Sequence, residues 1–329
     1  MLLTRREAGG TKRMSSSSNN KLFSALLCLA FTILLVQRSN ANPTKPLKIL
    51  VACGFHAREW STTILCERML ERVATHMRKE IQWIIIPRVN PAVDLVRNKT
   101  LGACWRWNSN RVDLNRNWPL VHDQLCPNES SDYVISKPGE ETYTGPHPFS
   151  EPETRKLRDT LIQEKPDIAF FVHTGSEMIL LPYESCLDKK PSNYRQYVKL
   201  AKWLSDYVSN GTDRVLVGQS SRMLYKSYGS LGDYATHVLH VPFAFTVETY
   251  RGVAHCSEQP IGFLQRATAE MTESDCEQTF VPHSPVSCSV DLDNYLTRWT
   301  ALVDAFTNAP VADLNLIREW IEQKSLVYP

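Results

Sequence analysis

The segment His56-Ala57-Arg58-Glu59 has the clearest chemical potential in the chain, because it offers an imidazole and a carboxylate three residues apart. It follows the apolar run 47–55, at the point where a predicted buried strand gives way to a helix. Two side chains from one short loop can reach a single divalent cation, and a third ligand must then come from elsewhere. That arrangement leaves one position open for water or substrate and is typical of catalytic zinc.

Two further ionisable side chains stand at the ends of predicted strands. His173 closes the apolar run 168–173, and Glu248 closes the run 243–248. Ligand-binding groups of an open α/β sheet gather at the carboxyl ends of its strands, so we expect both side chains to meet the first segment there. His173 is then the predicted third metal ligand. The plainer alternatives are a core histidine that is only hydrogen-bonded and a buried, paired structural glutamate.

Short apolar runs alternate with amphipathic stretches along the chain, without an obvious linker, which predicts one α/β domain. Continuous apolarity is typical of strands covered on both faces. Strands are expected at 47–54, 83–89, 168–173, 178–182 and 243–248. Helices are expected at 61–79, 151–163, 192–209, 290–307 and 312–325. Ser61 is the predicted N-cap of the first helix, and Ser150 with Glu153 forms a predicted capping box in the second.

The N-terminus has the pattern of a secretory signal peptide. Basic residues precede the apolar stretch 22–36, and the small residues Ser39 and Ala41 follow it. This predicts a signal peptide over residues 1–41, which leaves 42–329 as the mature domain. An uncleaved signal anchor is the alternative, but the stretch is shorter than the roughly 20 residues of a membrane span. No stable membrane span is therefore expected.

Cysteines and sequons agree with export to an oxidising compartment. Of the nine cysteines, Cys28 lies in the predicted signal peptide, and the even number that remains suits disulfides. Three glycosylation sequons begin at Asn98, Asn128 and Asn210. Together these features predict an extracellular or luminal protein. The formal net charge of +2, without a Lys/Arg block, argues against a nucleic-acid-binding surface.

The metal-ligand segment belongs to a longer series of motifs. Gly54-Phe55-His56-Ala57-Arg58-Glu59-Trp60 resembles the zinc-binding segment of the secreted metallocarboxypeptidases, the pancreatic carboxypeptidase A and B type. Further matches follow in the order of that family: Asn90-Pro91, Trp105-Arg106, Asp113-Leu114-Asn115-Arg116-Asn117-Trp118, Phe149-Ser150-Glu151-Pro152-Glu153-Thr154, His173, Leu181-Pro182-Tyr183, Tyr225 and Phe245-Thr246-Val247-Glu248. The resemblance implies a mixed, mostly parallel, twisted β-sheet flanked by helices.

The resemblance also implies the catalytic machinery. His56, Glu59 and His173 would hold one zinc ion per chain. Glu248 would be the general base, a role that suits a carboxylate beside the metal that is not itself a ligand. Arg106 would stabilise the oxyanion that forms at the scissile carbonyl.

The implied substrate is the C-terminus of a peptide or protein, and a monomeric enzyme is expected. Asn115 and Arg116 match the receptor for the free carboxylate, since a planar guanidinium binds a carboxylate bidentately. Arg58 would be a secondary carboxylate contact, and Tyr225 would close over the substrate. Taken singly, each of these arginines is more often a solvated or salt-bridged surface group.

Two alignments compete for the residue that sets specificity. In the family, the residue before an Asp-aromatic pair lines the bottom of the side-chain pocket, and here that residue is Gly232, followed by Asp233. Aligned backward from Glu248, Asp233 takes that place instead. Glu184 lies where another branch of the family has the acid that pairs with a C-terminal Lys or Arg; otherwise it is an exposed loop carboxylate beside Cys186. We expect a preference for basic C-terminal residues.

Two departures from the family pattern stand out. Only residues 42–46 separate the predicted cleavage site from the first strand, so the pro-domain and the first helix and strands of the family are missing from the pattern. A cysteine-containing insertion is expected at about 253–289. Cys104 and Cys126 bracket the Asn115-Arg116 loop and are expected to pair. The alternatives to an active carboxypeptidase are a non-catalytic carboxypeptidase-like binding protein and a zinc deacylase on the same scaffold.

Overall fold

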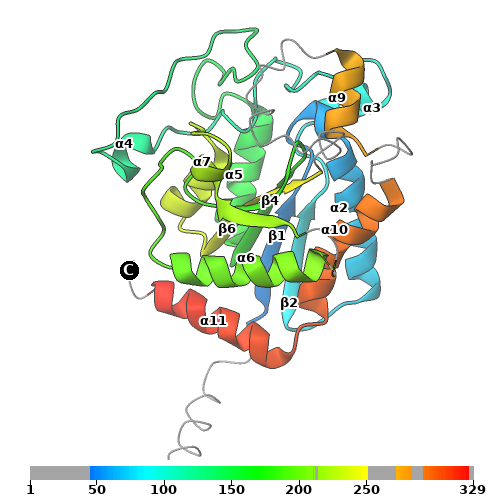
Figure 1. The fold of residues 1–329 in the computed structure, drawn as a ribbon, viewed down its shortest axis with the longest axis vertical. Coiled ribbons are helices and arrows are strands. Elements are labelled where there is room, and N and C mark those ends of the chain that lie inside the picture. The colour runs from blue at the N-terminus through cyan, green and yellow to red at the C-terminus, as the bar shows by residue number, and fades with distance from the viewer. Residues whose placement is uncertain (1–44, 210, 212–213, 251–271, 283–291, 326–329) are drawn as a thin grey trace, which may run out of the picture. The chain divides into compact units, whose positions relative to one another are not determined.

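The computed structural model describes residues 45–209, 211, 214–250, 272–282 and 292–325. Within them a six-stranded sheet has the order β2-β1-β3-β6-β4-β5. The strands are β1 (Leu47–Ala52), β2 (Ile81–Ile86), β3 (Ile168–His173), β4 (Glu177–Leu181), β5 (Leu216–Gln219) and β6 (Phe243–Thr249). The first four in spatial order are parallel, whereas β4 runs antiparallel to β6 and parallel to β5. The expected mixed, mostly parallel sheet is confirmed (Figure 1).

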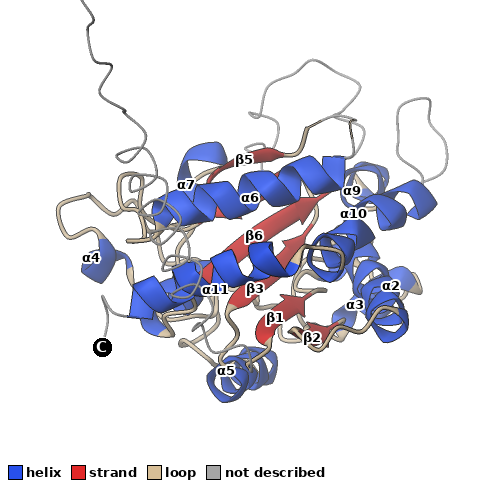
Figure 2. Ribbon diagram, turned by 90° about the horizontal axis from the view of Figure 1, so that it is seen from below, coloured by secondary structure: helices blue, strands red, loops and turns tan. Residues whose placement is uncertain are grey.

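Helices cover both faces of the sheet. They are α2 (Ser61–Thr75), α3 (Ala92–Arg97), α4 (His122–Leu125), α5 (Pro152–Glu164), α6 (Tyr194–Ser209), α7 (Ser220–Met223), α8 (Leu231–Asp233), α9 (Glu273–Phe280), α10 (Leu292–Thr307) and α11 (Val311–Ser325), with a 3-10 turn η1 (Ala57–Glu59) and a π-helical turn η2 (Tyr234–Val238). Figure 2 shows α5 and α10 on opposite sides of the strands.

Alternate residues of the central strands enter two separate cores. Ile49 and Val51 of β1 pack in a core with side chains of α2, α6, α10 and α11, whereas Leu50 and Ala52 pack in a second core with α5 and the η2 region. Continuous apolarity thus reflects burial on both faces, as the sequence pattern predicts. The short strand β5 carries little apolar sequence and was not predicted.

The five helices with expected ranges agree with them to within a few residues, except that α2 ends earlier; they are α2, α5, α6, α10 and α11. The predicted N-caps are wrong. Trp60 is the N-cap residue of α2, and its side chain makes no capping hydrogen bond. Glu151 precedes α5, and the Ser150 hydroxyl donates to the Glu151 carboxylate while it accepts from Asn117. The Ser150 side chain is therefore engaged with a neighbouring loop instead of the helix terminus.

Three disulfides join described cysteines: Cys53–Cys66, Cys104–Cys276 and Cys126–Cys186. The predicted Cys104–Cys126 pair is wrong, because α9 brings Cys276 to the first of them and the loop after β4 brings Cys186 to the second. Most of the expected insertion at 253–289 and the signal peptide at 1–41 lie outside the described residues. Within the described part of the chain, the helices are too short or too polar to cross a membrane.

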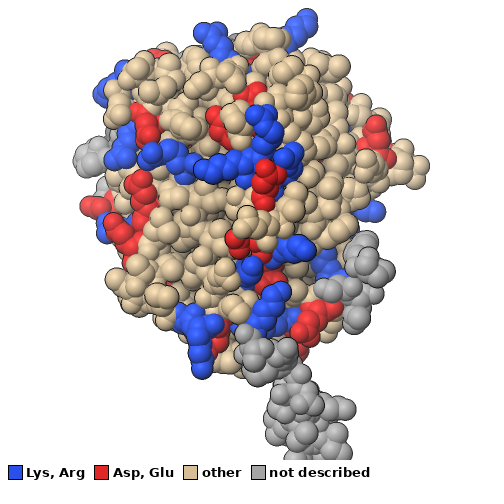
Figure 3. All heavy atoms as spheres, turned by 180° about the vertical axis from the view of Figure 1, so that it is seen from behind, with Lys and Arg blue, Asp and Glu red and all other residues tan. Residues whose placement is uncertain are grey.

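Figure 3 shows one face of the molecule, opposite that of Figure 1. A row of Lys and Arg side chains crosses it, and Asp and Glu side chains lie beside this row. Charges of both signs are therefore interspersed on this face.

Candidate metal centre and its cavity

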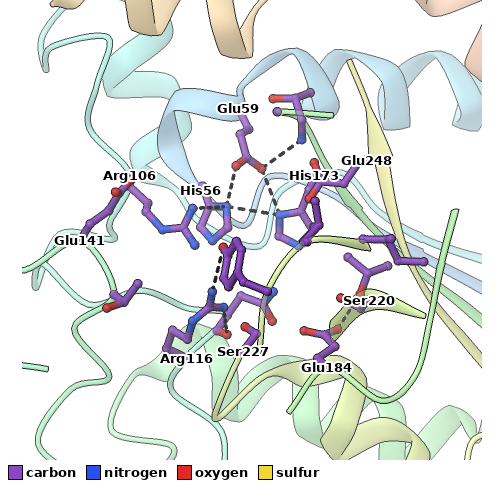
Figure 4. Close-up of a pocket in the computed structure, with 18 of the residues that line it drawn as sticks. His56, Glu59, Arg106, Arg116, Glu141, His173, Glu184, Ser220, Ser227 and Glu248 are labelled. Atoms are coloured by element: carbon purple, nitrogen blue, oxygen red, sulfur yellow. Dashed lines mark hydrogen bonds and ion pairs between the residues drawn. The ribbon is translucent and has the colours of Figure 1, made fainter. Parts of the chain in front are cut away.

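A cavity of about 340 Å³ lies beyond the carboxyl ends of β1, β3 and β6 (Figure 4). All but one of the predicted site residues line it: His56, Arg58, Glu59, Arg106, Asn115, Arg116, His173, Glu184, Tyr225 and Glu248. Gly232 lies behind this lining, in contact with Glu184. Segments far apart in the sequence thus meet in one site, as the positions at strand ends predict.

The turn after β1 delivers the first two predicted ligands. Gly54 has a φ of +69°, a left-handed conformation that a side chain disfavours, and its amide donates to the Thr62 hydroxyl at 3.0 Å. The chain then enters η1, so that His56 and Glu59 both face the cavity. Both side chains are almost fully buried.

The three predicted ligands converge on one point. His56 Nδ1 lies 2.7 Å from Glu59 Oε1, and His173 Nδ1 lies 3.0 Å from Glu59 Oε2. The two Nδ1 atoms are 3.3 Å apart, and each residue offers a ligand atom within 4.8 Å of the others. Two imidazole nitrogens and a carboxylate are a ligand set that suits zinc and leaves a coordination position open. The residues present therefore fit a catalytic zinc ion.

Asp113 orients this cluster. From the sequence, this residue was predicted only as part of a motif, without a role of its own. Its Oδ1 lies 3.1 Å from His56 Nε2, while its Oδ2 accepts two hydrogen bonds from the Arg106 guanidinium, at 2.7 and 2.9 Å. Burial alone would raise the pKa of this carboxyl, but Arg106 and His56 hold it well below its usual range. A carboxylate on the distal ring nitrogen fixes the tautomer and orientation of a metal-binding histidine.

Glu248 stands beside the cluster because of strand register. The parallel pairing of β3 with β6 sets His173 opposite Glu248, so both project from the same face of the sheet. Glu248 is partly exposed to the cavity. With no cation bound, burial and the neighbouring Glu59 carboxylate raise its pKa well above that of an ordinary glutamate, against the effect of Arg106.

Three arginines line the cavity: Arg58, Arg106 and Arg116. Arg116 donates to the backbone carbonyl of Asn115 at 2.8 Å and to the Tyr225 hydroxyl at 3.4 Å. Arg58 is not free: it pairs with Glu141 and lies 4.1 Å from the centroid of the Phe280 ring. Glu141 and Phe280 were not predicted from the sequence as part of the site. Phe280 is the last residue of α9, and the disulfide Cys104–Cys276 links this helix to the loop that contains Cys104.

Glu184 places a carboxylate in the part of the cavity away from His56, Glu59 and His173 (Figure 4), a part that we call the side-chain end, in contrast to the metal end. Glu184 is 4% exposed and accepts a hydrogen bond from the Thr246 hydroxyl at 2.8 Å, so its alternative as an exposed loop carboxylate is wrong. Burial raises its pKa, against the effects of Thr246 and Arg116. Asp233 instead accepts hydrogen bonds from the backbone amides of Glu184 and Ser185. Of these two acids, Glu184 lines the cavity, whereas Asp233 is not among the lining residues.

The comparisons with known proteins identify the family of the chain. The family model for zinc carboxypeptidases matches residues 18–280. Rat mast cell carboxypeptidase A is 28% identical over 57% of this chain and 48% of its own length. Rat carboxypeptidase B is 30% identical over 63% of this chain and 52% of its own. The chain thus spans about half the length of these curated relatives.

A similar fold occurs in the structure of bovine thrombin-activatable fibrinolysis inhibitor in complex with tick carboxypeptidase inhibitor. The TM-score is 0.55 at 23% identity, covering 81% of this chain and 84% of that chain. At this identity the likeness concerns the fold alone. The match of the family model over most of the sequence shows that the chain belongs to the zinc carboxypeptidase family.

Proposed function

We propose that this protein is a zinc-dependent carboxypeptidase that hydrolyses the C-terminal peptide bond of peptides and proteins, with a preference for C-terminal Lys or Arg. One observation carries the proposal: a single cavity holds the convergent His56, Glu59 and His173 ligand atoms, together with the guanidinium of Arg116. The first set suits attack on a carbonyl, and the second suits capture of a free carboxylate.

His56, Glu59 and His173 would hold the metal. When bound, zinc supplies Lewis-acid polarisation of a carbonyl and lowers the pKa of a coordinated water. Glu248 would take up a proton on its carboxylate and deliver it to the leaving amine. Its place opposite His173, beside the converging ligands and in the lining of the cavity, supports this role.

Arg106 would donate hydrogen bonds to the oxygen on which negative charge develops. Its two bonds to Asp113 fix the guanidinium in place before the substrate arrives, so little reorganisation is needed during the reaction. Arg116 with Asn115 would bind the substrate's terminal carboxylate, and Tyr225, which is 42% exposed, would cover it. Because Arg58 is already paired with Glu141, its part would be secondary.

The preference for basic residues rests on Glu184. A buried carboxylate that lines the cavity favours a cationic side chain in that space. We also propose that the protein is secreted, after removal of residues 1–41, and glycosylated at its sequons. Asn98 and Asn128 are exposed, which such a modification requires.

The test is to express the whole chain, measure its zinc content, and assay peptides that end in Arg, Lys, Phe or Glu. We expect one zinc per chain and stepwise loss of single C-terminal residues, fastest for Arg and Lys. Zinc binding without release from any peptide would contradict the proposal and favour a carboxypeptidase-like binding protein. Hydrolysis of acyl amides without release of C-terminal residues would favour a deacylase.

A further inference from the structure

The backbone conformation at position 232 does not require a glycine. Gly232 lies within α8 and does not have a left-handed φ, so a side chain would cause no backbone strain there. Glycine is also a poor residue inside a helix. A Cβ atom added at Gly232 would, however, lie 2.2 Å from Glu184 Oε1 and 3.0 Å from its Cδ. The Glu184 carboxylate therefore occupies the space that a side chain at 232 would take.

The Glu184 backbone is held from several directions and cannot easily withdraw. Its amide donates to Asp233 Oδ1 at 2.7 Å, and its carbonyl accepts from the Ser227 amide at 2.9 Å. On either side of it, the Gln219 side-chain amide donates to the carbonyl groups of Tyr183, at 3.4 Å, and Cys186, at 2.7 Å. A side chain at position 232 would consequently displace the Glu184 carboxylate, and not the loop.

The displaced group would be the acid of the cavity. Glu184 accepts a hydrogen bond from the Thr246 hydroxyl, and no Lys or Arg of the described residues forms an ion pair with it. A buried carboxylate without a cationic partner is costly unless a ligand supplies the cation. Ser220 and Ser227 line the same cavity, so hydroxyls lie close by for the remaining donors of a guanidinium.

We propose that Gly232 is a specificity-determining positioning residue, which acts through Glu184: the absence of a side chain at 232 lets the Glu184 carboxylate stand at the cavity and pair with the basic side chain of a C-terminal Arg. The inference rests on the proposed function, since it names the groups that recognise the substrate. Gly232 and Glu184 then form one unit, in which a side chain at 232 is excluded as long as the Glu184 carboxylate is present.

The experiment is a double-mutant cycle of Gly232→Ala and Glu184→Ala, with kcat/KM measured for two peptides that differ only in a C-terminal Arg or Phe. We expect Gly232→Ala to lower the Arg-to-Phe ratio by about tenfold or more, mainly through KM. In the Glu184→Ala background the added methyl group has room, so the same change should leave the ratio unaltered. Equal loss for both peptides in both backgrounds, or an unchanged ratio in folded Gly232→Ala, would overturn the inference.

Binding of free arginine to the zinc-loaded protein, measured by calorimetry, separates this inference from the proposed function. If the protein binds arginine and Gly232→Ala abolishes that binding, the inference stands even if no peptide is hydrolysed. If Gly232→Ala binds arginine as the unmodified protein does, the inference fails even if hydrolysis is observed. Should Gly232→Ala fold poorly, Glu184→Asp combined with it should restore folding and part of the Arg preference, because the shorter acid stays clear of the added methyl group. Lack of rescue would count against the proposed contact.

Discussion

The two ends of the cavity are built in different ways. At the metal end, His56 and Glu59 come from one turn after β1, and strand register sets His173 beside Glu248. At the side-chain end, the position of Glu184 depends on contacts with Gly232, Asp233 and other residues that follow it by several tens of positions in the chain. The positions of the groups at the metal end are thus set by the sheet. The position of Glu184 at the side-chain end is set by side chains that hydrogen-bond to its loop.

The difference suggests how the two ends respond to substitution. A group on a strand end keeps its position as long as the sheet forms, so the metal end should lose function mainly when a metal ligand, the Asp113 carboxylate that orients His56, or Glu248 is changed. A loop held by individual hydrogen bonds depends on each of them. Substitutions at the side-chain end should therefore alter selectivity, while those at the metal end should alter activity as a whole.

The largest effect is expected from loss of a metal ligand. His173→Ala removes one of three protein ligands, so zinc content should fall from about one per chain to near zero and hydrolysis of every peptide should be lost. Metal analysis of the purified variant and thermal unfolding check this. A variant that still carries a full equivalent of zinc would contradict the assigned ligand set.

Glu248→Gln should separate chemistry from metal binding. The amide cannot accept a proton, so kcat should fall by about 10²–10⁴-fold, the contribution usual for general acid–base catalysis. Zinc content should stay at one per chain, because Glu248 is not among the converging ligand atoms. Loss of zinc from this variant would place Glu248 among the ligands instead.

Asp113→Asn should weaken metal binding without removing a ligand. The carboxylate 3.1 Å from His56 Nε2 orients the imidazole, and loss of such a partner typically lowers metal affinity about 10–100-fold. Competition with a chelator measures this affinity. Asp123→Asn, on an exposed position of α4, is the matched control and should bind zinc as the unmodified protein does.

The smallest expected effect is a pH dependence confined to the side-chain end. Because burial raises the pKa of Glu184, its carboxyl ionises at a higher pH than the value of about 4.3 that is ordinary for glutamate. Arg116 opposes this shift. Burial and the nearby Glu184 also raise the pKa of the neighbouring Asp233, to about 7.

The ratio of Arg to Phe release should therefore increase as the pH rises through the raised pKa, since only the ionised acid attracts the cation. Ionisation of Glu248 affects both peptides alike and cancels in the ratio. Glu184→Gln should give a ratio that does not change with pH. A pH-dependent ratio that persists in that variant would assign the effect to another group.

The sequence predicted the metal end well and the side-chain end poorly, for a physical reason. Strand ends and the spacing within His56-Ala57-Arg58-Glu59 are local properties, and parallel strands bring their carboxyl ends to one edge. The contact of Gly232 with Glu184 and the pairing of Cys104 with Cys276 depend instead on how loops return to the core. The hydrophobic pattern of a loop does not specify such a return, which is why Glu141 was missed and the disulfide partners were misassigned.

The most direct test of the central claim compares one peptide ending in a free C-terminal Arg with the same peptide carrying a C-terminal amide. Mass spectrometry of the products formed by the zinc-loaded protein follows the loss of single residues. The account predicts removal of the terminal Arg from the free acid and at least about 10²-fold slower reaction with the amide, because Arg116 would have no carboxylate to bind. Equal rates with both peptides, or cleavage within the chain, would contradict it.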